Sequence, residues 1–261
     1  GVRRVVVGAL DTDSRVAGRG IETHRPAGIA GEVGVESATG GGADPGYFHH
    51  RRTGLPLAVL KQAMTLDGQI SAADGTSQWI TGEEARRDVH RLRADHDAVM
   101  VGAGTLRADD PGLDVRLAGY DGPQPVPVVV AGARPLPSGL RIWDRDPIVL
   151  APAGTVLSGM DVIGVGDGGR VDLRAGLEAL AERGILSVLV EGGAAVAAAM
   201  WEAGLVIRGV TYLGARLAGG TGRGAFDRVF KTLDDALDVE IVGVTNLGGD
   251  LRIDWRRAGR P

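Results

Sequence analysis

Residues 185–203 read ILSVLVEGGAAVAAAMWEA and carry the clearest structural signal in this 261-residue chain. A short apolar run, typical of a buried strand, ends at Glu191. Two glycines follow, and a segment of small residues then predicts a helix that ends at Gly204. Alternating strands and helices are the building units of α/β proteins, in which helices cover a mainly parallel sheet. This stretch therefore predicts the α/β class.

The same alternation extends over most of the chain. Strand-like apolar runs recur at residues 57–63, 98–101, 126–131, 148–151, 185–190, 208–213, 239–244 and 251–255. Between them, Thr81-Gly-Glu-Glu84 has the pattern of a capping box, and Asp172 is placed to cap another helix. The last two runs flank Gly248-Gly249 and predict an antiparallel hairpin at one sheet edge. The pattern as a whole predicts a three-layer α/β fold.

The front of the chain is organised differently. Residues 3–10 and 29–35 predict two short strands, and residues 36–46 form a glycine-rich break without periodicity. We expect a first segment over residues 1–52, linker included, and one larger domain over residues 53–261. The first residue is Gly1 and not Met, so we expect a fragment or a processed start.

Composition and charge exclude several classes of function. The chain has 29 Lys and Arg against 33 Asp and Glu, without a basic block, which disfavours nucleic acid as a partner. It contains no cysteine, which excludes disulfides, thiolate zinc sites and a cysteine nucleophile. The five histidines lack metal-ligand spacing, so we expect no metal. No apolar run is long enough to span a bilayer, so we expect a cytoplasmic protein without a membrane partner.

The turn at Glu191-Gly192-Gly193 is the first candidate site. Free N–H groups at the start of a helix attract anions, and glycine lets a pyrophosphate approach the backbone. The alternative is an ordinary strand-to-helix turn, because the G-x-G-x-x-G fingerprint is absent. Glu191 either faces the crevice at the strand end or satisfies the free N–H groups of the helix.

Two further groups of polar residues are candidates. Lys61 ends an apolar strand and either points into a pocket or extends outward to solvent. Thr105 follows Gly102 and Gly104 at a strand exit, and the pair Asp109-Asp110 reads as acids, metal ligands or a turn before proline.

An anion pocket is the next possibility. Ser77, Arg93 and Arg116 together are what a phosphate or carboxylate pocket requires, although each alone is more often a surface residue. Trp79 either packs in the core or stacks on a ligand ring.

Four segments taken together resemble a known family. They are LKQAMTLDG at 60–68, DGTSQWIT at 74–81, VGAGTLRADDP at 101–111 and VEGG at 190–193. In this order and spacing they resemble the reductase half of the bifunctional riboflavin-biosynthesis deaminase/reductase, from about residue 56 to about residue 256. Residues 2–34 look like the tail of that family's deaminase domain. The zinc-binding His-Ala-Glu segment and cysteines of the deaminase are absent, so this chain is not expected to deaminate.

The resemblance implies a fold and a reaction. The fold is similar to dihydrofolate reductase: a mixed, mostly parallel sheet flanked by helices. The reaction is the NADPH-dependent reduction of 5-amino-6-(5-phosphoribosylamino)uracil to the ribitylamino compound, with hydride added to C1′ of the opened ribose. The family also suggests a homodimer.

The resemblance further assigns residues to this reaction. It places the cofactor contacts on Ala63, Trp79, Thr105, Asp109, Gly132, Gly192, Gly193, Ala194, Ala195 and Val196. It places the substrate contacts on Ser77, Arg93, Leu113, Arg116 and Glu191, with Ser77, Arg93 and Arg116 on the 5′-phosphate. Lys61, Asp109 and Glu191 are the polar groups expected near C1′, and which of them, or water, gives the proton stays open. The alternatives are a related reductase acting on a pterin or another heterocycle, and an inactive binding module.

Overall fold

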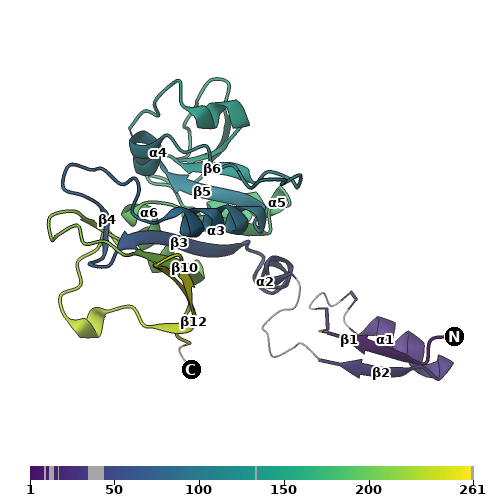
Figure 1. The fold of residues 1–261 in the computed structure, drawn as a ribbon. Helices are drawn as coiled ribbons and strands as arrows, with labels where there is room; N and C mark the ends of the chain where they lie inside the picture. Colours follow the sequence, from purple (N-terminus) through teal and green to yellow (C-terminus); the bar gives the residue numbers. More distant parts are fainter. Residues whose placement is uncertain (9, 12–14, 17, 35–43, 133, 260–261) are drawn as a thin grey trace. The chain divides into compact units, whose positions relative to one another are not determined.

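The computed structural model describes residues 1–261 apart from 9, 12–14, 17, 35–43, 133 and 260–261 (Figure 1). It divides into two compact units. The first comprises Gly1–Leu57 and Leu180–Leu186, and the second comprises Ala58–Ala179 and Ser187–Pro261.

The first unit contains a small parallel pair of strands. Strand β1 (Arg4–Val7) pairs with β2 (Ala30–Val33), and helix α1 (Arg19–His24) and the 3-10 helix η1 (Arg25–Ala27) lie between them in the chain. Both predicted strands are confirmed over shorter ranges. Helix α2 (Pro45–Thr53) was not predicted, although Asp44 caps it by accepting a 2.9 Å hydrogen bond from Tyr47 N. The expected boundary at residues 52/53 falls within this helix, and most of the predicted linker lies outside the described residues.

The second unit is built on a large mixed sheet. Within the described residues its nine strands run in the order β12 (Val239–Leu247), β13 (Asp250–Arg257), β10 (Val206–Gly214), β3 (Leu57–Thr65), β9 (Ser187–Val190), β5 (Ala98–Gly102), β6 (Val126–Val130), β7 (Ile148–Ala151) and β8 (Asp161–Gly164). Strands β9, β5, β6, β7 and β8 pair in parallel, as do β3 and β10. The β12–β13 hairpin is antiparallel at one edge, as predicted. The expected mixed, mostly parallel sheet is confirmed.

Helices flank this sheet (Figure 1). They are α3 (Glu83–Ala94), α4 (Ala103–Asp109), α5 (Leu173–Glu182) and α6 (Ala194–Glu202). Helix α3 contacts β13, α4 contacts β5 and β6, and α6 contacts β5. Short elements complete the unit: β4 (Gln69–Ser71), η3 (Arg141–Arg145), β11 (Arg223–Gly224) and η4 (Leu233–Asp235). No helix among the described residues is long and apolar enough to cross a membrane.

The predicted helix caps had different outcomes. Asp172 caps α5 as predicted, because its Oδ1 accepts hydrogen bonds from the backbone N of Arg174 and of Ala175. The capping box at residues 81–84 is wrong, because Gly82 is the cap residue of α3 and no side chain of the box caps it. Instead, the Gly82 N–H donates to Asp250 Oδ2 at 2.5 Å, a partner that lies 168 positions away in the chain.

The core lies in the central parallel strands. The residues at 98–101 and 188–190 are at most 1% exposed, as expected where helices cover both faces of a parallel sheet. Gly209 on β10 is required by packing, since a Cβ there would lie 2.3 Å from Cζ2 of Trp255. The Trp255 ring packs in turn against Trp201 of α6, with ring centroids 6.0 Å apart. This packing fixes α6, whose first turn lines a cavity of this unit.

Candidate active site

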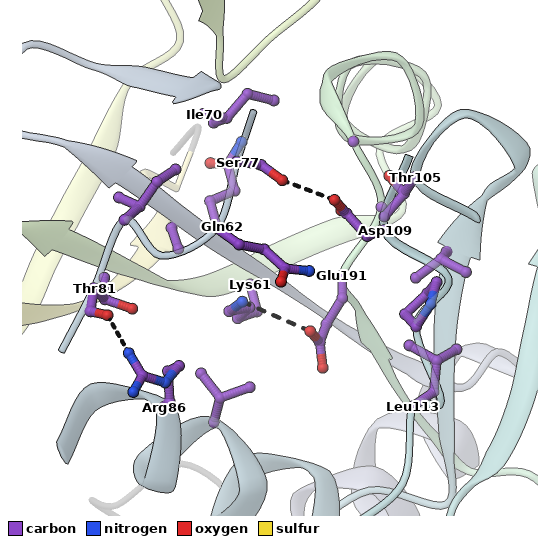
Figure 2. Close-up of a pocket in the computed structure, with 18 of the residues that line it drawn as sticks. Lys61, Gln62, Ile70, Ser77, Thr81, Arg86, Thr105, Asp109, Leu113 and Glu191 are labelled. Atoms are coloured by element: carbon purple, nitrogen blue, oxygen red, sulfur yellow. Dashed lines mark hydrogen bonds and ion pairs between the residues drawn. The ribbon is translucent and has the colours of Figure 1, made fainter. Parts of the chain in front are cut away.

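A cavity of about 630 Å³ lies in the second unit (Figure 2). It is lined by β3, the segment after β4, α3, α4 and the segment after it, the end of β9 and the first turn of α6. Thirteen of the predicted site residues line it: Lys61, Ala63, Ser77, Trp79, Arg93, Thr105, Asp109, Leu113, Arg116, Glu191, Gly192, Gly193 and Ala194. Residues that are up to 133 positions apart in the chain therefore meet in one place.

A buried ion cluster is the main feature of this cavity. Arg93 Nε donates to Glu191 Oε1 at 2.6 Å, and Arg93 Nη2 donates to Oε2 at 3.1 Å. Lys61 Nζ lies 3.6 Å from the same Oε2 (Figure 2). The side chains of Lys61, Arg93 and Glu191 are 15%, 11% and 9% exposed. This settles two alternatives: Lys61 and Glu191 both face the cavity.

The charges around Glu191 fix its protonation state. Burial raises the pKa of this carboxyl, but the charges of Arg93 and Lys61 outweigh burial and lower the pKa to about 2. Glu191 is therefore ionised at neutral pH. A carboxylate accepts hydrogen bonds and holds no proton to give, so Glu191 is not the acid in this state.

A second pair joins the segment after β4 to the end of α4. Ser77 Oγ donates to Asp109 Oδ1 at 2.7 Å (Figure 2). The neighbouring Asp110 does not line the cavity; it ends α4 with a φ of 40° and forms an ion pair with Arg141 at 3.1 Å. The adjacent acids thus have separate roles. Among the described residues, no group of three acids or histidines is arranged to hold a metal ion.

The three residues predicted to hold a phosphate line the same cavity, but each has its own partner. Arg93 is occupied by Glu191 and also donates from Nη1 to the Asp114 carbonyl at 3.0 Å. The Arg116 side chain is 54% exposed, with Nη1 3.8 Å from Asp114 Oδ1. Of these three side chains, Arg116 is the least restrained by contacts within the fold.

The start of α6 forms an open backbone surface on the cavity. Gly193 is the cap residue, and in the described part of the chain no side chain accepts a hydrogen bond there. A Cβ on Gly193 would lie 3.0 Å from Thr105 Oγ1, and one on Gly192 would lie 2.7 Å from Val196 Cβ. A Cβ at Gly192 therefore has no room, and one at Gly193 would crowd the Thr105 hydroxyl. The geometry fits a group that presents phosphate oxygens to free N–H donors.

Three of the predicted cofactor residues do not line the cavity. Gly132 and Ala195 are exposed outside it. Val196 is 9% exposed and packs in the first turn of α6, where its side chain occupies the space beside Gly102 and Gly192. Its evident role is to position the glycine turn.

Comparison with known proteins gives the family. The model of the RibD C-terminal domain matches residues 56–253. The chain belongs to the RibD C-terminal domain family. Riboflavin biosynthesis protein RibD of Chlamydia muridarum is 38% identical over 271 residues, covering 99% of this chain and 73% of that protein.

Solved structures agree with this family assignment. Acinetobacter baumannii RibD matches with a TM-score of 0.88 at 30% identity, over 99% of this chain and 74% of that one. The Thermotoga maritima diaminohydroxyphosphoribosylaminopyrimidine deaminase/5-amino-6-(5-phosphoribosylamino)uracil reductase matches with a TM-score of 0.85 at 26% identity, over 99% of this chain and 72% of that one. The predicted membership is confirmed, and the RibD C-terminal domain match includes every predicted site residue.

The cavity also contains residues that the sequence patterns did not indicate. Gln62 is buried and donates from Nε2 to the Ala225 carbonyl at 2.8 Å. Arg86 lies 4.6 Å over the Trp79 ring, which is 56% exposed, so core packing is the wrong interpretation of Trp79. His90 also lines the cavity. The sequence feature that indicates a place for His90 in the site is its position three residues before Arg93, which puts both on the same helix face.

Proposed function

We propose that this protein catalyses the NADPH-dependent reduction of 5-amino-6-(5-phosphoribosylamino)uracil to 5-amino-6-(5-phosphoribitylamino)uracil. The observation that carries the proposal is the ion cluster of Lys61, Glu191 and Arg93 in the same cavity as the open glycine turn of α6. The family membership and the reductase activity named for the Thermotoga maritima relative support it.

The cofactor end of the cavity is assigned to the start of α6. The N–H groups after Gly193 would hold the pyrophosphate, and the Thr105 hydroxyl lies beside them. Trp79, partly exposed at the cavity, would contact the nicotinamide nucleotide. The bound NADPH supplies the hydride. Its choice over NADH rests on the family resemblance.

The substrate end contains the ion cluster. Reduction adds a hydride to C1′ of the opened ribose and a proton to the nitrogen attached to it, so that the carbon–nitrogen double bond becomes single. The ionised Glu191 accepts hydrogen bonds from sugar hydroxyl groups, and Lys61 Nζ donates one. Because Glu191 holds no proton, the proton comes from Lys61, from Asp109 or from water.

The 5′-phosphate is assigned to Ser77, Arg93 and Arg116. Arg93 retains one N–H on each Nη after its contacts with Glu191 and Asp114. Arg116 is free to turn toward an anion because its side chain is 54% exposed and its closest ion-pair distance is 3.8 Å. Charge-assisted bonds to phosphate from arginine are among the strong ones.

The wider organisation is proposed on the same basis. Residues 1–52 correspond to the end of a deaminase domain and its linker, and residues 53–261 to the reductase domain. The match to Chlamydia muridarum RibD covers 99% of this chain and so includes residues ahead of the reductase domain. We assign the protein to the cytoplasm, as expected from its sequence, and we propose a homodimer, as the family resemblance suggests.

The test measures the oxidation of NADPH by its falling absorbance. The substrate, 5-amino-6-(5-phosphoribosylamino)uracil, is prepared by enzymatic deamination of its precursor, and NADH is tested in parallel. Turnover with NADPH supports the proposal, and absence of both NADPH binding and turnover overturns it. Arg116→Ala should raise the KM for the substrate about tenfold while the KM for NADPH stays unchanged. Arg87→Ala, which removes an exposed arginine paired with Glu83 outside the cavity, is the control. A phosphate-free pterin substrate would show no effect of Arg116→Ala.

A further inference from the structure

His90 is a half-buried histidine on the substrate side of the cavity. It lies on α3 one turn before Arg93. Its two ring nitrogens have different surroundings. Nδ1 contacts the segment that carries Asp114 and Arg116, and Nε2 has no hydrogen-bond partner among the described residues. The site therefore contains a histidine nitrogen that is free to bind a ligand.

The surroundings of Nδ1 suit both protonation states of the ring. Nδ1 lies 3.2 Å from the Arg116 backbone N and 3.1 Å from the Asp114 carbonyl oxygen. In the neutral ring with the proton on Nε2, Nδ1 accepts from the Arg116 N–H. In the charged ring, Nδ1–H donates to the Asp114 carbonyl. The segment 114–116 therefore supports a proton change without rearrangement.

The charges facing His90 favour the neutral ring in the free enzyme. Burial lowers its pKa most, the Arg93 and Arg116 guanidinium groups lower it further, and the Asp114 carbonyl and carboxylate oppose them. Of the two acids among the described residues that line the cavity, Glu191 is held by Arg93 and Lys61, and Asp109 accepts a hydrogen bond from Ser77. A ligand that brings negative charge between the two arginines would reverse this balance.

We propose that His90 is a further substrate-binding residue whose ring takes up a proton from solvent when a phosphate group enters beside Arg93 and Arg116. Nε2–H donates to a phosphate oxygen, and Nδ1–H then donates to the Asp114 carbonyl. This deepens the proposed function and rests on it, because it needs a phosphorylated substrate at these arginines. Its consequence is that substrate binds more tightly at lower pH.

The first test is the pH dependence of the KM for the substrate. Because the bound state holds an extra proton, the KM rises with pH between the His90 midpoints of the free and bound enzyme, by up to about tenfold per pH unit. The phosphate itself gives the opposite sign, since it becomes a dianion with a pKa of about 6. His90→Gln keeps an amide donor but cannot be charged, so this rise should disappear. The control His96→Gln, two residues after the same helix ends and outside the cavity, should retain it.

The second test does not depend on turnover. The ring signal of His90, assigned from its loss in His90→Gln, is titrated by NMR with ribose 5-phosphate and with ribose. A higher midpoint with ribose 5-phosphate alone supports the proposal. An equal midpoint with both sugars overturns it, as does an equal pH dependence of KM in the wild type and His90→Gln. If the enzyme shows no NADPH turnover, the proposed function fails while the titration still decides the role of His90.

Discussion

Glu191→Gln removes the negative charge at the centre of the buried ion cluster. A pKa lowered from 4.5 to about 2 corresponds to about 3 kcal/mol in favour of the ionised carboxylate, at about 1.4 kcal/mol per pH unit. The group is buried, so solvent screens little of this energy. Glutamine has nearly the same shape but no charge, and it leaves Arg93 and Lys61 buried without their counter-ion. We expect the free energy of unfolding to fall by about 3 kcal/mol at pH 7, in the range for breaking a buried ion pair.

The loss should depend on pH in a defined direction. A lowered carboxyl pKa stabilises the folded state above the unfolded value of 4.5, and this stabilisation is lost as the pH falls from 4.5 toward 2. The difference between wild type and Glu191→Gln is therefore complete at pH 7 and shrinks below pH 4.5. Urea unfolding followed by tryptophan fluorescence measures it. All four tryptophans lie between residues 58 and 261, so this signal reports the second unit.

Glu202→Gln is the matched control for this measurement. Glu202 forms an ion pair with Arg228 at 2.8 Å, but the two side chains are 54% and 43% exposed. An exposed pair of this kind contributes less than about 1 kcal/mol. The reasoning is refuted if Glu191→Gln costs no more than the control, or if its cost stays constant as the pH is lowered.

Three further predictions concern other parts of the site and its support. Ser77→Ala removes the hydroxyl that donates to Asp109 at 2.7 Å, and steady-state kinetics should show kcat/KM lowered about tenfold, the upper end of what one hydrogen bond contributes; an unchanged kcat/KM would contradict this. Gly193→Val adds a side chain where a Cβ would lie 3.0 Å from a neighbouring hydroxyl oxygen, and should raise the Kd for NADPH at least about tenfold. Quenching of tryptophan fluorescence measures that Kd, and an unaltered value would remove α6 from the cofactor site. Tyr212→Phe removes a buried hydroxyl that donates to Asp88 at 2.7 Å, so urea unfolding should show a loss of about 2 kcal/mol, and a loss near zero would show that the bond contributes nothing.

The central strands were predictable because burial on both faces leaves a continuous apolar run in the sequence. Strand β5 is buried along its whole length, and β9 is buried at three of four residues. Strand β8 was missed because it lies at the sheet edge and only Ile163 is buried. Helix α4 was missed because seven residues containing Gly104 give no helical period, and the glycines before it resembled a loop.

The site was predictable as a set of residues but not as a set of contacts. Local patterns identified Lys61, Arg93 and Glu191, but the hydrogen bonds between Arg93 and Glu191 join positions 98 apart. Such a pairing depends on strand order and helix placement, which no local pattern contains. Sequence reasoning therefore grouped Arg93 with Ser77 and Arg116, whereas its closest partner is Glu191. The spacing of His90 from the other histidines argues against a metal site, whereas its spacing of three residues from Arg93 places both side chains on one helix face.

The charge of the cavity supports the proposal that its arginines bind a phosphorylated substrate. The chain has a net charge of −4. Among the described residues that line the cavity, five are cations and two are acids: Lys61, Arg86, Arg93, Arg116 and Arg141 against Asp109 and Glu191. The excess of positive charge is concentrated in a hollow with low-dielectric walls, which raises the local concentration of anions. Glu191 offsets one of the two buried positive charges of Lys61 and Arg93, and the more exposed Arg116 is the proposed phosphate ligand. A neutral heterocycle would gain nothing from this arrangement, whereas a sugar phosphate and a dinucleotide both would.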